Sequence, residues 1–518
     1  MSTAPATTTA QAPERVGTSR MWAILALVLL ADGLDMIDST VTNIAAPTIA
    51  AHLGGGESLI KWLGTAYMLA MGVLLVVGGR LGDKFGQRRL FLIGMSGFTV
   101  ASAVAGISPS PALLIAARAT QGAFGALMIP QGMAIMTKTF SSEMRTKAFA
   151  LFGPLLGLAT VGGPVLAGFI IDANLFGLSW RPIFLVNVFL GVLGLALAAK
   201  ILPAVDGDRA TSIDGLGSGL LAGTMFGVLY GLIEGSTNGW TTLPILSITG
   251  GLVCFAAFAR RQTTVPDPLL KPSLLANRGF LSGLLVGLTV FAATVGLVYV
   301  LSLFIQNGLG ASPRQASLAL LPLTLGIIIV AAGATMGLIA KLGRTLIFAG
   351  LAIVLLGCAA VLALVAHSGT NLELWTLAPA IFVIGLGMGA CYGTIFDVAL
   401  GDIDPDEAGS ATGSLSAIQQ LAGGIGSAAV TSVFFSTASA GLSHAMQISL
   451  IVTLGLIVIS IPAVALMPKT PPKTSSTDER LAASGAQAVA IELMPEAERA
   501  LLKQIAAVAD PPMDYLRA

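Results

Sequence analysis

Three carboxyl groups interrupt the first hydrophobic run of the chain. The stretch "ADGLDMIDSTVTN", from Ala31 to Asn43, holds Asp32, Asp35 and Asp38 at regular intervals. Three residues advance an α-helix by about 300°, so the three side chains would fall within roughly 120° of arc. A carboxyl group in a low dielectric, beside like charges, favours its protonated form and exchanges its proton when its surroundings change. The pattern therefore predicts proton chemistry on one side of a helix.

One arginine could be the partner of these acids. Arg118 is the only basic residue deep inside a hydrophobic segment, and a buried cation needs an anion. We predict a proton-coupling network of Arg118 with the acids, first Asp38, then Asp35 and Asp32. The alternatives are an ion pair that only holds two helices together and, for Asp32, a place lining a water-filled vestibule. Asp397, near the end of a later segment, is interpreted as a helix-end residue.

The composition indicates a chain embedded in a lipid bilayer. Of 518 residues, 55% are hydrophobic and only 10% are charged, against roughly 25% charged residues in soluble domains. Mean hydropathy is +0.88. Cys254, Cys358 and Cys391 lie in apolar segments without ligand spacing, which excludes a disulfide framework and a zinc site. The sequence has no basic tract interleaved with aromatic residues, which would have indicated binding to nucleic acid. The chain is predicted to be an all-α polytopic membrane protein.

Segments of about 20 apolar residues, enough to cross a bilayer, recur along the chain. We predict fourteen such spans, at 21–49, 59–79, 88–108, 111–137, 146–173, 182–202, 212–233, 243–259, 278–306, 313–340, 344–366, 375–400, 408–439 and 443–467.

The loops between these spans predict an orientation. Basic residues fall almost entirely in loops on one side, and the opposite loops hold only Lys61, Arg181 and Arg314. Since cytoplasmic loops carry the excess of Lys and Arg, both termini are expected in the cytoplasm.

A short internal match suggests two related halves. "GGRLGDKFGQRR" (78–89) and "TMGLIAKLGRT" (335–345) align Gly86 with Gly343, and duplicated halves are common in transporters. The predicted organisation is a disordered cytoplasmic tail at 1–20, a six-helix half at 21–202, two inserted helices with connectors at 203–277, a second six-helix half at 278–467 and a cytoplasmic tail at 468–518.

Five motifs follow one another along the first six predicted spans. They are "IDSTVTNIAAP" (37–47), "GGRLGDKFGQRR" (78–89), "RATQGAFGALMIP" (118–130), "GLATVGGPVLAG" (157–168) and "WRPIFLVNVFLG" (180–191). In this order they resemble the signatures of the fourteen-helix drug:proton antiporters of the major facilitator superfamily, over about 21–466. The resemblance implies the major facilitator fold, with two six-helix halves plus two inserted helices. It departs at Ala159 and Ala167, where the family has glycine, and at Phe189, where it has proline.

The resemblance also implies roles for two groups of residues. The second motif would form a gate on the cytoplasmic side, with Asp83, Arg80, Arg88, Gly82 and Gly86. Ordinary anchoring by positive charge explains the arginines there but not the aspartate. The fourth motif, which resembles the antiporter motif of the family, would seal the path against proton leak, with Gly157, Gly163, Pro164 and Gly168. Its small residues would also allow close approach of helices.

Polar, aromatic or soft side chains inside the spans are candidates for a substrate cavity. Apolar walls with a few polar groups suit amphipathic ligands, although ordinary helix packing is the alternative for each residue alone. The candidates are Tyr67, Gln121, Met128, Met133, Asn187, Tyr299, Gln306 and Gln420.

These observations predict a proton-coupled multidrug efflux transporter. It would export amphipathic organic compounds across the plasma membrane by alternating access and function as a monomer. No phosphate-binding GxxxxGK[ST] loop indicates a nucleotide, and no cofactor or metal is expected. The alternatives are an exporter of one metabolite or self-made antibiotic, and a non-transporting sensor or scaffold. An enzyme is not expected, because the three histidines (His52, His367, His444) lie near predicted outer loops without a catalytic constellation.

Overall fold

A computed structural model describes the architecture. It describes residues 17–140, 144, 148, 163–203, 207–208, 214–265, 268–269, 272–333, 338–401, 403 and 408–468. The chain divides into two compact units, Met1–Thr470 and Pro471–Ala518, and the described residues belong to the first. They form helices and connecting turns, with no strand among them.

The first group of helices follows the predicted spans closely. It comprises α1 (Thr18–Leu53), α2 (Gly56–Phe85), α3 (Gln87–Gly106), α4 (Pro111–Thr139), a helix at Gly163–Ala173, the turn η1 (Leu175–Gly177) and α6 (Pro182–Ile201). The ends of these helices have local causes. Gly54 closes α1 with a φ of 74°, and Ser110 caps α4 by accepting a hydrogen bond from the Leu113 amide.

Two inserted helices form a hairpin. These are α7 (Gly215–Asn238) and α8 (Thr242–Gln262), followed by the short α9 (Pro272–Ala276). Asp214 caps α7 through the Gly217 amide and pairs with Arg261 of α8 at 2.8 Å. One carboxylate thus fixes the start of one helix and ties it to the end of the other.

The second group completes the bundle. It comprises α10 (Arg278–Leu303), η2 (Phe304–Gly308), α11 (Pro313–Ala319), α12 (Leu321–Gly333), α13 (Ile339–Leu342), α14 (Arg344–Ser368), η4 (Gly369–Asn371), η5 (Leu374–Leu377), α15 (Ala378–Leu400), α16 (Ala408–Thr437), η6 (Ala438–Ala440) and α17 (Leu442–Leu466).

Twelve helices in the described part are long and apolar enough to cross a membrane. Two further predicted spans correspond to α1, which has 36 residues but carries the three acids, and to Gly163–Ala173, a shorter apolar helix. The all-helical fold is as predicted, and the count of fourteen spans stays a prediction.

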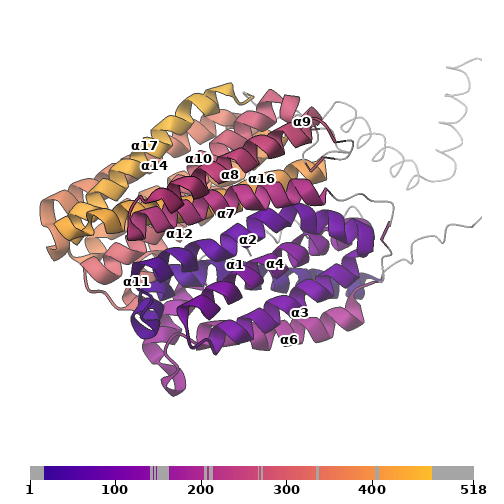
Figure 1. Cartoon of the computed structure of the whole chain (residues 1–518), viewed down its shortest axis with the longest axis horizontal. Helices are drawn as coiled ribbons and strands as arrows, with labels where there is room; N and C mark the ends of the chain where they lie inside the picture. The colour runs from indigo at the N-terminus through magenta and orange to yellow at the C-terminus, as the bar shows by residue number, and fades with distance from the viewer. Residues whose placement is uncertain are drawn as a thin grey trace, which may run out of the picture. The chain divides into compact units, whose positions relative to one another are not determined.

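Each group of six packs around its own helices, and α2 and α16 join the groups. In the first group, α4 packs on α2 and α3, and α1 lies against α2, α4 and α6 (Figure 1). In the second, α10 packs on α16 and α17, and α15 packs on α12 and α14. The inserted α7 contacts both α2 and α16. Glycines allow the closest approaches, since a Cβ on Gly122 would strike the Tyr67 carbonyl and one on Gly426 would strike that of Ala292.

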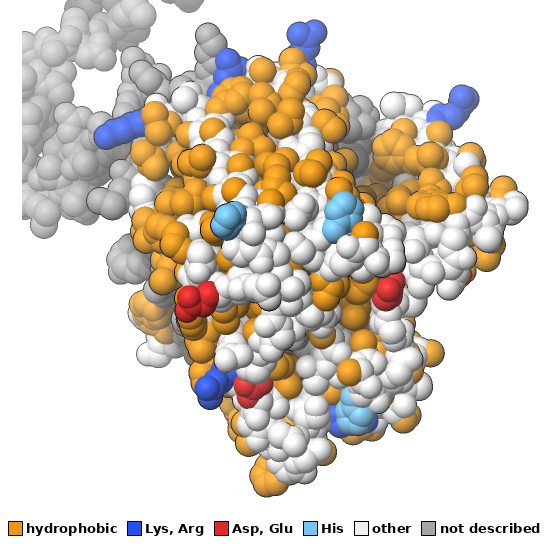
Figure 2. Space-filling view, turned by 90° about the vertical axis from the view of Figure 1, so that its left-hand side faces the viewer, with side chains coloured by type: hydrophobic (Ala, Val, Ile, Leu, Met, Phe, Trp, Pro, Cys, Tyr) orange, Lys and Arg blue, Asp and Glu red, His pale blue; other side chains and the backbone are white. Residues whose placement is uncertain are grey.

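The surface of the bundle suits a lipid environment. Figure 2 looks onto the end of the bundle where α11 lies, and hydrophobic side chains there alternate with polar, histidine and charged ones, as suits an end that would face water and not lipid. Large apolar side chains on several helices are more than half exposed, including Val100, Phe189 and Leu356. Such exposure is costly in water and favourable against lipid chains.

Candidate functional site: a buried charged network and a neutral cavity

The Asp38 carboxylate is the centre of a buried network that joins three helices. Asp38 of α1 is fully buried and pairs with the guanidinium of Arg118 of α4. It also accepts hydrogen bonds from Gln121 Nε2 at 3.1 Å and from Asn187 Nδ2 of α6 at 2.5 Å. Arg118 Nη2 donates to the Asp38 backbone carbonyl at 3.1 Å. The structure therefore brings together the arginine and the first acid of the predicted network.

Tyr67 of α2 links a second acid to the same arginine. Its hydroxyl donates a hydrogen bond to Asp35 Oδ1, and its ring centroid lies 4.5 Å from the Arg118 guanidinium carbon. The pair fits against α4 because Gly125 has no side chain. A Cβ there would lie 2.8 Å from Asp35 Oδ1 and 3.3 Å from the Tyr67 hydroxyl.

The network holds more carboxyl groups than cations. Asp32 is 6% exposed and Asp35 is fully buried, and each has one carboxyl oxygen without a hydrogen-bond partner among the described residues. Among the described residues, Arg118 is the one buried cation in contact with this group. An uncompensated buried charge costs roughly several kcal/mol. The carboxyl groups that have no cation as a partner are therefore suited to holding protons.

A cavity of about 180 Å³ lies between the two groups of helices. On the α1 side it is lined by Met36, Ser39, Thr40 and Asn43. The three acids do not line it, and the bonds of Asp38 point into the first group.

The predicted cavity residues fall in several places. Gln420 lines the cavity and donates a hydrogen bond to Met71 Sδ at 2.9 Å. Three belong to the charged network: Tyr67, Gln121 and Asn187. Two pack in the apolar core: Met128 and Met133. Two form hydrogen bonds near the end of α10: Tyr299 and Gln306. A role for any of them in substrate binding stays a prediction.

The residues of the predicted gate bond within the first group and the connector. Asp83 lies 3.6 Å from Lys138, and both side chains are about half exposed, so the pair contributes little stability. Arg80 donates to the Pro268 carbonyl at 2.6 Å, and Arg88 donates to that of Ala199 at 2.5 Å. Gly82 leaves room for the Gln131 side chain, and Gly86, with a φ of 93°, starts α3. Gating by these residues stays a prediction.

The small residues of the predicted antiporter motif bring helices into contact. Gly157 lies outside the described residues. A Cβ on Gly163 would strike α1 near Thr40, and one on Gly168 would strike Ser317 of α11. Pro164 lines the central cavity. The motif thus contributes a cavity wall and close contacts with both groups of helices.

Lys61 is the residue that sequence reasoning placed wrongly. It was counted among the residues of the outer loops, although the predicted span 59–79 contains it; it lies in α2 and its side chain is fully buried. Its amine donates to Ser236 Oγ and to Thr237 Oγ1 of α7, both at 3.0 Å. Ser236 Oγ in turn donates to Ser432 Oγ of α16 at 2.7 Å. This chain connects the first group, the inserted hairpin and the second group.

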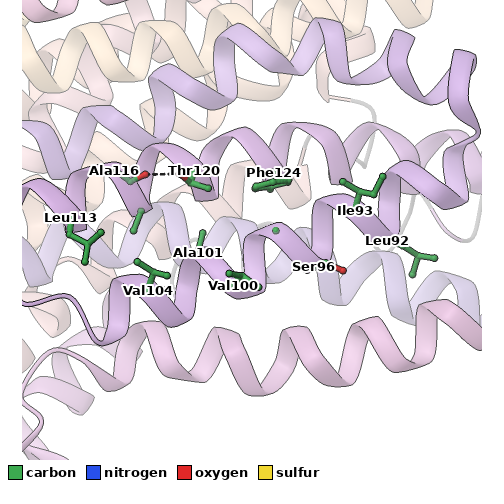
Figure 3. A pocket seen from close by; sticks show the side chains of 12 residues that line it. Leu92, Ile93, Ser96, Val100, Ala101, Val104, Leu113, Ala116, Thr120 and Phe124 are labelled. Atoms are coloured by element: carbon green, nitrogen blue, oxygen red, sulfur yellow. Dashed lines mark hydrogen bonds between the residues drawn. The ribbon is translucent and has the colours of Figure 1, made fainter.

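A larger apolar groove, of about 620 Å³, lies on the outside of α3 and α4. Figure 3 shows Val100 and Val104 of α3 facing Leu113 and Phe124 of α4 along it. No charged side chain lines it, and we assign it to the lipid-facing surface.

No group of three or more His, Cys, Asp or Glu residues in the described part of the chain is arranged to hold a metal ion.

Comparison with known proteins identifies the family. The model of the Major Facilitator Superfamily matches residues 28–427. The chain belongs to the major facilitator superfamily. A probable actinorhodin transporter of Streptomyces coelicolor is 38% identical over 423 residues, covering 80% of this chain and 73% of that protein. The puromycin resistance protein of Streptomyces alboniger is 34% identical, covering 80% of this chain and 82% of its own length.

Solved structures show the same fold at low sequence identity. An auto-inhibited POT family peptide transporter aligns with a TM-score of 0.62 at 14% identity, covering 85% of this chain and 95% of that one. A D-xylose–proton symporter aligns with a TM-score of 0.61 at 16% identity, covering 88% of this chain and all of that one. As a member of this superfamily the protein is a multi-pass membrane transporter of small molecules, related to antibiotic exporters, and not an enzyme.

Proposed function

We propose that the protein exports amphipathic organic compounds in exchange for protons. The observation that carries the proposal is the buried Asp38–Arg118 pair, with two further buried carboxyl groups, Asp35 and Asp32, on the same helix. Such a group can take up protons when its access changes, while the Asp38–Arg118 pair holds α1 to α4. The proton-coupling residues are Asp38, Arg118, Asp35 and Asp32.

The contacts between the two groups of helices support alternating access. At the end where α1 finishes, Tyr299 donates to the Ile60 carbonyl and Ser302 donates to that of Asn43, both at 2.6 Å. We infer that this end faces outward and that both termini are cytoplasmic, as the loop charges predict. In this conformation these bonds join α10 to α1 and α2 on the side inferred to be external. One chain supplies both halves of the cavity, which supports a monomer in the plasma membrane as the working unit.

Breadth of substrate separates two forms of this proposal. Broad multidrug export is the first. The second is export of one self-made antibiotic. The relatives named for actinorhodin transport and puromycin resistance support this second form. A resistance profile of cells that express the protein distinguishes the two, since the first predicts protection against chemically unrelated compounds.

Proteoliposomes with an imposed proton gradient test the coupling. The wild-type protein and the Asp38→Asn variant are compared for gradient-driven uptake of fluorescent tricyclic compounds, with a pH dye reporting proton movement. We expect uptake and proton exchange in the wild type and loss of both in Asp38→Asn. Asp397→Asn is the matched control, because Asp397 is exposed on α15 and outside the network, and it should retain coupling. Undiminished proton exchange per substrate in Asp38→Asn would contradict the proposal.

A further inference from the structure

The central cavity has a lining without acidic or basic side chains. Its walls come from α1, α2, α10, α11, α12, α15, α16 and the helix Gly163–Ala173. None of the described residues that line it is Asp, Glu, Lys, Arg or His. The sequence from Ala148 to Ile171, which leads into that last helix, also carries no such residue. The neutrality of the lining therefore holds for every described helix that lines the cavity and not for a single helix.

The charges of the first half are directed away from this cavity. The Asp38 carboxylate is held by groups of α4 and α6, and Asp35 is held by Tyr67. Asp32 lies one helical turn before Met36, outside the lining. An organic cation in the cavity would lose its water and meet no opposite charge, which costs free energy that an uncharged molecule does not lose.

Two amide side chains face the cavity with unused hydrogen-bonding capacity. Asn43 on α1 and Gln419 on α16 line it, and neither side chain has a hydrogen-bond partner among the described residues. Each amide offers two donors and one acceptor oxygen. Ser39 and Thr40 donate to the Met36 carbonyl and so present acceptor lone pairs. A bound molecule with both donors and acceptors could therefore bridge the two halves.

The remaining walls are apolar and adaptable. Met36, Met68 and Met388 contribute thioether side chains, and Tyr392 contributes an aromatic ring. Methionine packs well against flat aromatic surfaces of varied outline. The volume of about 180 Å³ is below the roughly 300–1,000 Å³ of pockets for drug-sized ligands, so this conformation fits a compact molecule.

We propose that this cavity selects uncharged, planar molecules that carry hydrogen-bond donors and acceptors, in preference to organic cations. The inference rests on the proposed export function of the same cavity. It assigns the recognition of the substrate to Asn43, which lies within the first motif, and to Gln419, which lies outside the five motifs, and leaves the charged network to the proton.

Binding to the purified full-length protein in lipid nanodiscs tests the selectivity without a proton gradient. Acridone and 10-methylacridinium are the probes, because both are fluorescent tricycles of similar size. The first is uncharged with an N–H donor and a C=O acceptor, and the second is a permanent cation. We expect acridone to bind at least about tenfold more tightly.

Three variants sharpen the measurement. Asn43→Ala combined with Gln419→Ala should weaken acridone binding by about tenfold, the loss expected from two hydrogen bonds, and leave the cation unaffected. Gln447→Ala is the control, because it removes an amide of α17 that does not line the cavity. Gln419→Glu adds a carboxylate to the lining and should reverse the preference toward the cation.

Equal or tighter binding of the cation by the wild type would overturn the proposal. Failure of acridone to bind would overturn it too, since acridone carries every required feature. A thermal melt of each variant separates loss of binding from loss of folding. The Gln419→Glu variant is informative in itself, because its expected result is tighter binding of the cation and not a loss of binding. Selective acridone binding without gradient-driven transport would contradict the proposed antiport and not the selectivity. Gradient-driven transport of the cation alone would contradict the selectivity and not the antiport.

Discussion

The two six-helix halves bury different kinds of polar groups. The first half buries three aspartates, a lysine and an arginine. In the described part of the second half, every buried polar side chain is a hydroxyl or an amide. Thr294 and Tyr392 are typical, since their hydroxyls bond to each other at 2.7 Å beside the ring of Phe291.

We propose that this difference assigns proton binding to the first half, while the second half contributes neutral groups to the cavity wall. A buried charge must keep its partner, so the charged half is held in a specific arrangement and can respond to a proton. Neutral hydroxyls and amides can exchange partners at small cost, which suits a wall that meets varied molecules. The comparison predicts that equivalent polar deletions will have large effects in the first half and small effects in the second.

Removing the arginine should have the largest effect. Arg118→Ala leaves Asp38 buried without its ion-pair partner, and breaking such a pair costs about 3–5 kcal/mol. We expect a large fall in the thermal unfolding temperature in nanodiscs, together with loss of proton-driven transport. Adding Asp38→Asn should restore part of the stability, because it removes the unpaired charge. A melting temperature close to that of the wild type would break the comparison.

Lys61→Met probes the junction between the halves. The change removes hydrogen bonds from an ammonium group to Ser236 and Thr237, and bonds to charged groups contribute about 1.5–3 kcal/mol each. The retained apolar stem limits the net loss to about the lower value. The melting temperature should fall, and Lys61→Arg should recover part of it. An unchanged melting temperature would show that the contact with α7 contributes no stability.

Gly125→Ala tests the fit of the network against α4. The new Cβ would crowd Asp35 and Tyr67, and overpacking of this kind costs about 1–3 kcal/mol. Gly413→Ala in α16 is the matched control, because nothing lies within 4 Å of its Cβ position. We expect the first variant to be destabilised and the second to be neutral or slightly stabilised. Equal melting temperatures for the two variants would contradict the described packing.

The smallest effect should come from the neutral pair. Tyr392→Phe removes one hydrogen bond to Thr294, worth about 0.5–1.5 kcal/mol. Proton exchange per transported molecule should be unchanged in the liposome assay. A double-mutant cycle with Thr294→Val measures the bond itself, and a loss as large as that in Arg118→Ala would remove the distinction between the halves.

The sequence allowed good prediction of the helices and of one side-chain pair. Apolar segments of membrane length can hardly be anything else, so the boundaries of α3 and α6 differ from those predicted by only one or two residues. The pairing of Asp38 with Arg118 was predictable because both lie deep inside predicted spans, where each charge lacks water and an opposite charge is its best partner. The coupling role of the pair stays a prediction.

Other features depend on contacts that a sequence pattern does not specify. Polar residues inside spans look alike, so Tyr67 was assigned to the cavity, although Gly122 and Gly125 of α4 draw it into the charged network. Lys61 was read as a loop residue because it lies near the end of a span. Its partners are hydroxyl groups of α7, far along the chain, and hydroxyls at a helix end carry no distinctive pattern.

The neutral lining of the cavity also determines which energy source can drive export. When an uncharged molecule leaves in exchange for a proton, each cycle carries one net elementary charge inward. A membrane voltage of 100 mV is worth about 2.3 kcal/mol per charge, which sustains a roughly fiftyfold concentration difference per proton without any pH gradient. A singly charged cation exchanged for one proton would move no net charge. Under the proposed exchange of one proton for one uncharged molecule, transport would therefore be electrogenic.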